Sequence, residues 1–140
     1  MAANQLRIDG LEELRRALLA LPADLVADAA TVVRTAANDT ARDITAAYGA
    51  VRRTGNLQSH VRVDHGGTRA GATSRVVSTA RHAYIYERGT VARQWKNGKS
   101  TGVMPAANQF IPIAMARRQV MVDALMEVVE RTGLTVRPVI

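Results

Sequence analysis

The chain has 140 residues, the size of one domain, and 47% of them are hydrophobic, which is enough to form a core. Aromatic residues make up only 4%, so the core has to be mostly aliphatic, and the absence of cysteine excludes disulfide bonds and thiol chemistry. A formal net charge of +7 and an isoelectric point of about 11.0 favour contact with polyanions, while no apolar run approaches the roughly 20 residues that span a membrane.

Two helices are predicted in the first third of the chain, after a short extended segment at residues 5–10. Asp9 is a candidate cap of the first helix, with Glu12 as its capping-box partner, and this helix ends near Leu21. The second helix covers residues 23–50, with a stop at Gly49. Its apolar face has residues at helical spacing: Leu25, Ala29, Val32, Ala36, Thr40 and Ile44.

The hydrophobic period changes from about 3.6 to about 2 after the tripeptide Thr54-Gly55-Asn56. We expect a structural turn here, in which Gly55 supplies a positive φ and Asn56 a local side-chain bond to the backbone. A half-buried strand is predicted from Leu57 to Asp64, followed by a hairpin connection at residues 65–71. One long strand or two successive strands should follow between residues 73 and 90.

Regular periodicity disappears from Gly89 to Gln109. About 20 residues without an element are unusual in a compact domain and tend to be functional or mobile. The predicted strand-to-loop junction comprises Tyr86, Glu87, Gly89 and Thr90.

Helical spacing returns at Phe110, and the last helix is predicted to end at a Gly133 cap. Residues 134–140 form a β-prone extended tail, which Pro138 limits to an edge position. The predicted stripe of this helix is Ile113, Ala116, Val120, Ala124 and Val128.

The order of these elements predicts a single α+β domain over residues 1–140. We expect a small antiparallel sheet with the long helix and the C-terminal helix packed on one face. A long loop should connect the last core strand to the last helix.

No catalytic or metal-binding pattern is present among the polar residues. The three histidines, His60, His65 and His82, lack the further ligands of a metal site, so surface or hydrogen-bonded roles are favoured. No nucleophile elbow accompanies the serines, and Glu87 is expected to form a salt bridge. We therefore predict a protein that is not an enzyme and has no catalytic, cofactor-binding or metal site.

The segment "WKNGKS" leaves three interpretations open. Trp95, Lys96 and Lys99 could contact nucleic acid by stacking and charge. They could equally anchor a partner protein, because Trp and Arg are favoured at interface centres. The third interpretation is a mobile loop without a specific role.

Four segments in a fixed order resemble the neck and tail-completion family of long-tailed double-stranded DNA phages, whose members are also described as head–tail connector or minor tail proteins. These segments are "IDGLEELRRALLALP", "RTGNLQSHV", "HAYIYERGT" and "VMPAANQFIPIAMARR". The similarity covers roughly residues 8–131. The chain departs from the family pattern where Arg52-Arg53 replace a Pro and an Asp, and where Asn108-Gln109 replace the proline before Phe110.

The resemblance implies a structural virion protein, made in the cytoplasm of a host bacterium, with no cofactor and no membrane. Such proteins form a cyclic homo-oligomer, with six copies suggested by the family, at the head–tail junction. The implied partners are the adjoining connector or stopper and the tail tube proteins, and genomic DNA passes transiently through the ring. A tail terminator ring that caps the tail tube is the alternative, and a basic nucleic-acid-binding protein is a further one.

A closed ring needs one surface of a subunit to meet a different surface of the next. The loop at residues 89–109 is our first candidate for the element that reaches the neighbour, and the tail at residues 134–140 is the second. The predicted subunit or partner interface consists of Arg93, Trp95, Lys96, Lys99, Met104, Phe110, Val136 and Arg137.

Overall fold

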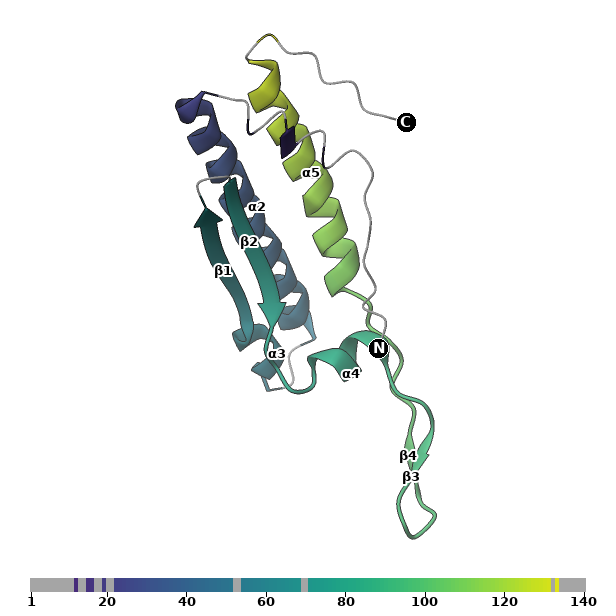
Figure 1. Ribbon diagram of the computed structural model, residues 1–140. Helices are drawn as coiled ribbons and strands as arrows, with labels where there is room; N and C mark the ends of the chain where they lie inside the picture. Colours follow the sequence, from purple (N-terminus) through teal and green to yellow (C-terminus); the bar gives the residue numbers. More distant parts are fainter. Residues whose placement is uncertain are drawn as a thin grey trace.

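The fold is α+β, with a long helix, a two-stranded antiparallel sheet and a C-terminal helix (Figure 1). The computed structural model describes residues 12, 15–16, 19, 22–51, 54–68, 71–131 and 133. The predicted strand at residues 5–10 and the tail at residues 134–140 lie outside the described residues. So does most of the predicted first helix, of which residues 12, 15, 16 and 19 are helical.

Helix α2 (Ala23–Ala50) is the element to which the others attach. Pro22 precedes its first residue, where its fixed φ and missing N–H are tolerated. Its buried residues are Ala29, Ala37, Thr40, Ile44 and Tyr48, so the predicted helix and most of its predicted inner face are confirmed. The small residues on this face let α2 pack against both the sheet and α5.

The chain turns sharply after α2 at Gly55, which has a φ of 77°. The positive φ predicted for Gly55 is confirmed, but the local side-chain bond comes from Thr54, whose hydroxyl accepts the Asn56 N–H at 3.3 Å. The strand predicted from Leu57 is wrong, because residues Asn56–Ser59 form the helical turn α3. The Ser59 N–H donates to the carbonyl of Gly55 at 3.0 Å, and this local bonding delays the strand to Val61.

Strands β1 (Val61–Thr68) and β2 (Gly71–Ser78) form an antiparallel hairpin along α2 (Figure 1). The register pairs Val61 with Ser78 and Thr68 with Gly71. The predicted hairpin is therefore confirmed, although its strands extend into the segment assigned to the connection.

The segment Ala83–Arg88 is a helix, α4, and the strand predicted here is wrong. Its backbone closes helical bonds, from the Tyr86 N–H to the His82 carbonyl at 2.9 Å and from the Gly89 N–H to the Ile85 carbonyl at 2.8 Å. Tyr-Ile-Tyr has high β propensity, but propensity yields to tertiary contacts. Here those contacts are made by the side chains of Tyr86 and Glu87.

The segment predicted as an unstructured loop contains two short strands, β3 (Arg93–Gln94) and β4 (Ser100–Gly102). They pair antiparallel with a register shift and form a hairpin that projects beyond the end of the helices (Figure 1). We call residues 91–104 the arm. The prediction of an extended connection is thus right in position, but its backbone is ordered by pairing.

Helix α5 (Phe110–Glu130) lies antiparallel to α2 and confirms the predicted last helix (Figure 1). Its buried residues Leu125, Val128 and Val129 form the main core with Ala29 of α2. The predicted stripe is only partly right, because Val120 is 58% exposed. The error is one of phase, since several faces of this helix carry apolar residues and periodicity alone does not select one.

Candidate functional site

The ends of α2, α4 and α5 meet at a polar junction that is centred on Glu87. Tyr48, in the last turn of α2, is only 2% exposed, and its hydroxyl donates to Glu87 Oε1 at 2.9 Å. The Tyr86 ring packs edge-on against Tyr48, with centroids 5.5 Å apart and planes at 88°. This edge-to-face geometry is the arrangement that aromatic pairs prefer.

The second oxygen of Glu87 caps the start of α5. Glu87 Oε2 accepts the backbone N–H of Gln109 at 2.7 Å and that of Phe110 at 3.1 Å. The first N–H groups of a helix have no partner within it, and a carboxylate there also interacts favourably with the helix dipole. One side chain thus holds the start of α5 to the end of α2. Among the described residues Glu87 makes these three hydrogen bonds and not the predicted salt bridge.

Both tyrosines of the junction hold their protons firmly. Burial raises the pKa of Tyr48 above its ordinary value, and the hydrogen bond to Glu87 raises it further. Burial and the Glu87 charge raise the pKa of Tyr86 in the same direction. Tyr86 donates to Gln109 Oε1 at 3.2 Å. Because each hydroxyl stays protonated, each remains a hydrogen-bond donor across the neutral pH range.

The base of the arm is clamped directly behind this junction. The Thr90 N–H donates to the Met104 carbonyl at 2.9 Å, and the Thr90 hydroxyl accepts the Met104 N–H at 3.0 Å. Further along, the Ala107 N–H donates to the Tyr86 carbonyl at 3.0 Å and the Asn108 N–H to the Glu87 carbonyl at 3.2 Å. The predicted junction residues therefore lie together, but at a helix-to-arm junction instead of a strand-to-loop one.

Gly89 is the residue that allows the two sides of the arm to come this close. It has a φ of 72°, and a Cβ built on it would lie 2.6 Å from the Met104 carbonyl oxygen and 2.7 Å from the Ala106 nitrogen. No side chain fits there without moving the backbone. The glycine is required for both its conformation and its lack of volume.

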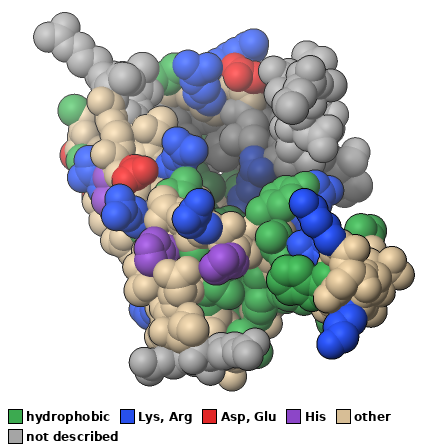
Figure 2. Space-filling model, turned by 90° about the horizontal axis from the view of Figure 1, so that it is seen from below, with side chains coloured by type: hydrophobic (Ala, Val, Ile, Leu, Met, Phe, Trp, Pro, Cys, Tyr) green, Lys and Arg blue, Asp and Glu red, His purple; other side chains and the backbone are tan. Residues whose placement is uncertain are grey.

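The arm exposes large apolar side chains next to basic ones. Val91 is 80% exposed, Trp95 66% and Val103 63%. The predicted interface residues Arg93, Trp95, Lys96 and Lys99 all lie on it and are exposed. Residues 89–109 contain those three basic residues and no acidic one. Figure 2, which views this end of the molecule, shows hydrophobic side chains grouped beside Lys and Arg.

Two further predicted interface residues, Met104 and Phe110, lie away from the arm's tip. Met104 lies at its base and is 37% exposed, whereas Phe110 is half-buried at the start of α5. Val136 and Arg137 lie outside the described residues.

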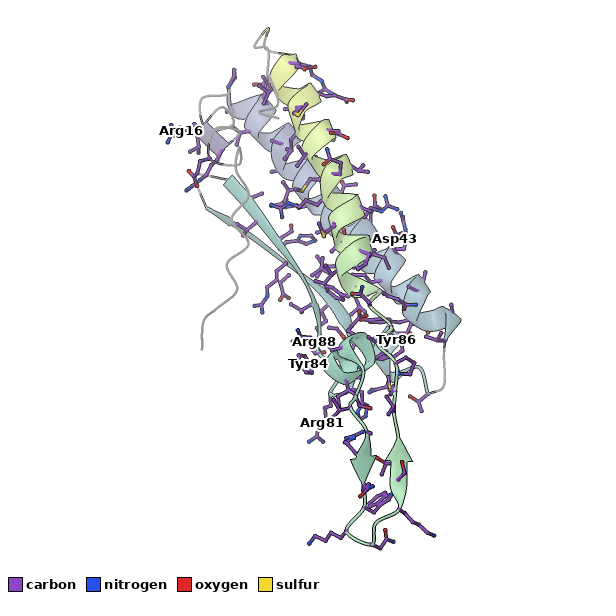
Figure 3. All side chains as sticks on the ribbon, turned by 90° about the vertical axis from the view of Figure 1, so that its right-hand side faces the viewer. Arg16, Asp43, Arg81, Tyr84, Tyr86 and Arg88 are labelled. Carbon is purple, nitrogen blue, oxygen red and sulfur yellow. The ribbon has the colours of Figure 1, made fainter. Side chains whose placement is uncertain are left out.

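The sequence interpretation missed a second exposed face, on α4. Tyr84 is 68% exposed, and the Arg88 guanidinium lies 5.4 Å from its ring centroid and donates to its hydroxyl at 2.9 Å. Figure 3 shows Tyr84 and Arg88 on one side of α4, near Arg81, with Tyr86 on the other side. Tyr84 and Arg88 are four residues apart, which makes them neighbours on a helix but not on the strand that was predicted here.

An ion-pair network links the middle of α2 to α5. Arg117 of α5 bonds Asp43 through its Nε atom and lies 3.8 Å from Asp39, which also pairs with Arg42 at 2.9 Å. The hydrogen bond from Arg117 lowers the pKa of Asp43 below its ordinary value, against the opposing effect of burial. This network adds a polar contact between α2 and α5 beside their apolar core.

The histidines take local hydrogen-bonding roles. His60 Nδ1 lies 2.7 Å from the Asn56 carbonyl oxygen, and His65 lies 2.9 Å from the Ser74 hydroxyl and 3.2 Å from the Asn38 side-chain oxygen. Within the described part of the chain, no three His, Cys, Asp or Glu residues converge as metal ligands would. No helix among the same residues is both long and apolar enough to cross a membrane.

In comparisons with known proteins, no protein-family model, no curated protein and no solved structure matches the chain.

Replacing Glu87 by Gln should lower the free energy of unfolding by about 1–3 kcal/mol, because the cap of α5 loses its charge and a hydrogen bond loses its ionised acceptor. Urea unfolding followed by circular dichroism measures this. Glu130→Gln, the same change at an exposed residue at the far end of α5, is the matched control and should stay within about 0.5 kcal/mol of the wild type. Equal effects of the two changes would contradict the capping role of Glu87.

Replacing Gly89 by Ala should destabilise the protein more than the same change at Gly98. Both glycines have positive φ, at 72° and 81°, so both substitutions are strained, by about 1–3 kcal/mol. A Cβ at Gly98 meets nothing within 4 Å, so the extra loss at Gly89 isolates the clash with the arm's base. Thermal unfolding of the two variants makes the comparison, and equal losses would refute the clash.

Proposed function

We propose that the chain is a structural virion protein that forms a ring at the head–tail junction of a long-tailed double-stranded DNA phage. In this role it completes the tail and joins it to the head connector, and DNA passes through the ring. A tail terminator ring that caps the tail tube is the alternative position for the same kind of assembly. The proposal rests first on the ordered set of segments that resemble the neck and tail-completion family.

The observation that carries the proposal is the way two of those segments hold the arm. Residues of "YIYERGT" and of "VMPAANQF" interlock through Glu87 with Phe110 and through Thr90 with Met104. The residues that resemble the family pattern are therefore the ones that fix the base of an exposed hairpin. A resemblance confined to core positions would speak only for a fold, whereas this one also concerns a projecting element.

The arm has the properties that a ring interface requires. It extends away from the body of the subunit (Figure 1). Its exposed apolar side chains contribute a favourable hydrophobic free energy only when another surface covers them. A contact between an arm and a different surface is heterologous, and such contacts close into rings when the rotation between subunits allows.

The basic charge of the arm fits either of two neighbours. It attracts phosphates if it faces the DNA channel, and it pairs with acidic residues if it faces an adjoining protein. We favour the protein contact, because a channel that DNA has to traverse quickly should not hold it tightly. The rival function, a basic nucleic-acid-binding protein, uses the same residues, with Trp95 stacking on bases.

Deletion of residues 91–102 should leave the fold intact and prevent assembly. The ends of the deletion are held together by the Thr90–Met104 bonds, so a two-residue Gly-Asn turn can replace the arm. We expect unchanged far-ultraviolet circular dichroism, a monomeric mass by light scattering where the wild type forms cyclic oligomers, and phage particles whose heads and tails stay separate.

Three results would count against this proposal. A wild-type chain that stays monomeric at high concentration and is absent from the neck of imaged particles would overturn it. Tight, steeply salt-dependent DNA binding by that monomer would favour the rival function. Loss of the fold on deletion would show that the arm belongs to the core.

A further inference from the structure

A groove runs between α2 and α5 on the side of the molecule. It encloses about 200 Å³, and the residues around it are Thr31, Val32, Thr35, Ala36, Asp39, Arg117, Val120, Met121 and Ala124. Most of this lining is apolar, and Val120 at its edge is 58% exposed. Its two charged members, Asp39 and Arg117, pair with each other, so an occupant need not supply a charge to balance them.

The volume of the groove suits one large side chain. Pockets for drug-sized ligands and cofactors are roughly 300–1,000 Å³, so this groove is small for such a molecule. A single aromatic side chain buries roughly 150–250 Å² and is the most effective occupant of an apolar depression of this size.

The chain itself offers such a side chain at the tip of the arm. Trp95 is 66% exposed and is the only tryptophan in the sequence. The backbone N–H of Trp95 donates to the Lys99 carbonyl at 2.8 Å, and the backbone N–H of Gly98 donates to the Trp95 carbonyl at 2.9 Å. These bonds order the backbone that presents the indole ring, so little conformational entropy is lost when the ring is buried. The arm that carries Trp95 projects beyond the end of the helices, whereas the groove lies between α2 and α5 (Figure 1).

The charges beside the groove complement those of the arm. Asp123 and Glu127 stand three residues after Val120 and Ala124 on α5, and are therefore their surface neighbours. Both are exposed, and among the described residues neither forms an ion pair. Lys96 and Lys99, beside Trp95, are likewise exposed and unpaired within the described part of the chain.

We infer that Trp95 of one copy inserts into the α2–α5 groove of a second copy, with Lys96 and Lys99 against Asp123 and Glu127. This inference rests on the proposed ring and names its subunit contact. The arm and the groove are different surfaces, so the contact is heterologous and each copy both donates an arm and accepts one. Trp is the residue type most enriched among those that dominate interface energies.

Tryptophan fluorescence of the full chain tests this contact, because all of the signal comes from Trp95. Indole emission moves to shorter wavelength when the ring leaves water. We expect a blue shift with rising protein concentration, in step with the increase in mass measured by light scattering.

Filling the groove should move the blue shift to higher protein concentration. Ala124→Leu places added volume inside the groove. We expect this change to raise the protein concentration at the midpoint of the blue shift at least about tenfold. Ala116→Leu is the matched control, since Ala116 is an exposed residue of α5 outside the lining, and its midpoint should stay at the wild-type value. If Ala124→Leu unfolds, Glu127→Lys provides a second test: it should weaken association, and Lys96→Glu in the same chain should restore it.

The outcomes separate the inference from the proposed function. Association of the wild type without a blue shift, or with no difference between Ala124→Leu and Ala116→Leu, overturns the groove contact and leaves the ring proposal standing. A groove-dependent shift in open chains that are absent from phage necks supports the contact and overturns the proposed function. A blue-shifted emission already present in the dilute monomer overturns the inference, because Trp95 would then be covered by a segment of its own chain.

Discussion

The carboxylate of Glu87 accepts hydrogen bonds with both of its oxygens and so joins the end of α2 to the start of α5. One oxygen accepts the Tyr48 hydroxyl at the end of α2, and the other accepts two backbone N–H groups at the start of α5. These N–H groups would otherwise lack partners in a partly buried place, which costs roughly 1–3 kcal/mol for each group left unsatisfied. Because Glu87 itself belongs to α4, this short helix is held between the two long ones.

The position of the arm follows from this constraint. Gly89 lies two residues after Glu87, and its φ of 72° sends the chain away from the body of the domain. The return segment is bound back through Met104 to Thr90 and through Asn108 to the Glu87 carbonyl. A projecting hairpin with a fixed base can deliver an exposed side chain such as Trp95 to a neighbour with a smaller entropic cost than a mobile loop. This is why the junction, which has no exposed functional group at its centre, bears on the proposed assembly.

The sequence predicted the elements whose apolar residues repeat over many turns. For α2 the spacing from Ala29 to Ile44 sufficed, and for the β1–β2 hairpin the alternation of Val61 and Val63 before a glycine-rich turn did. The short elements were not predictable in this way. Residues 56–59 and 83–88 form helices of fewer than two turns, too brief to show a helical period. Tyr86 and Glu87 are held in place by contacts with residues more than 20 positions away.

The sequence predicted the arm of the candidate site but not the junction that holds it. The lack of periodicity after Gly89 located the arm, and the residue types marked Trp95 and its basic neighbours. The role of Glu87 could not be predicted, because a carboxylate between a tyrosine and an arginine resembles an ordinary surface ion pair. Its partners Tyr48 and Phe110 lie far from Glu87 in the sequence and meet it only in the folded chain.

A double-mutant cycle between Tyr48 and Glu87 tests most directly whether this carboxylate joins the helices. The free energy of unfolding is measured for the wild type, Tyr48→Phe, Glu87→Gln and the double variant under identical conditions. We expect a coupling energy of about 0.5–3 kcal/mol, because removal of either partner already breaks the shared bond. Losses that add to within about 0.3 kcal/mol would contradict this role, since the Tyr48–Glu87 bond would then contribute nothing to the joint between α2 and the start of α5.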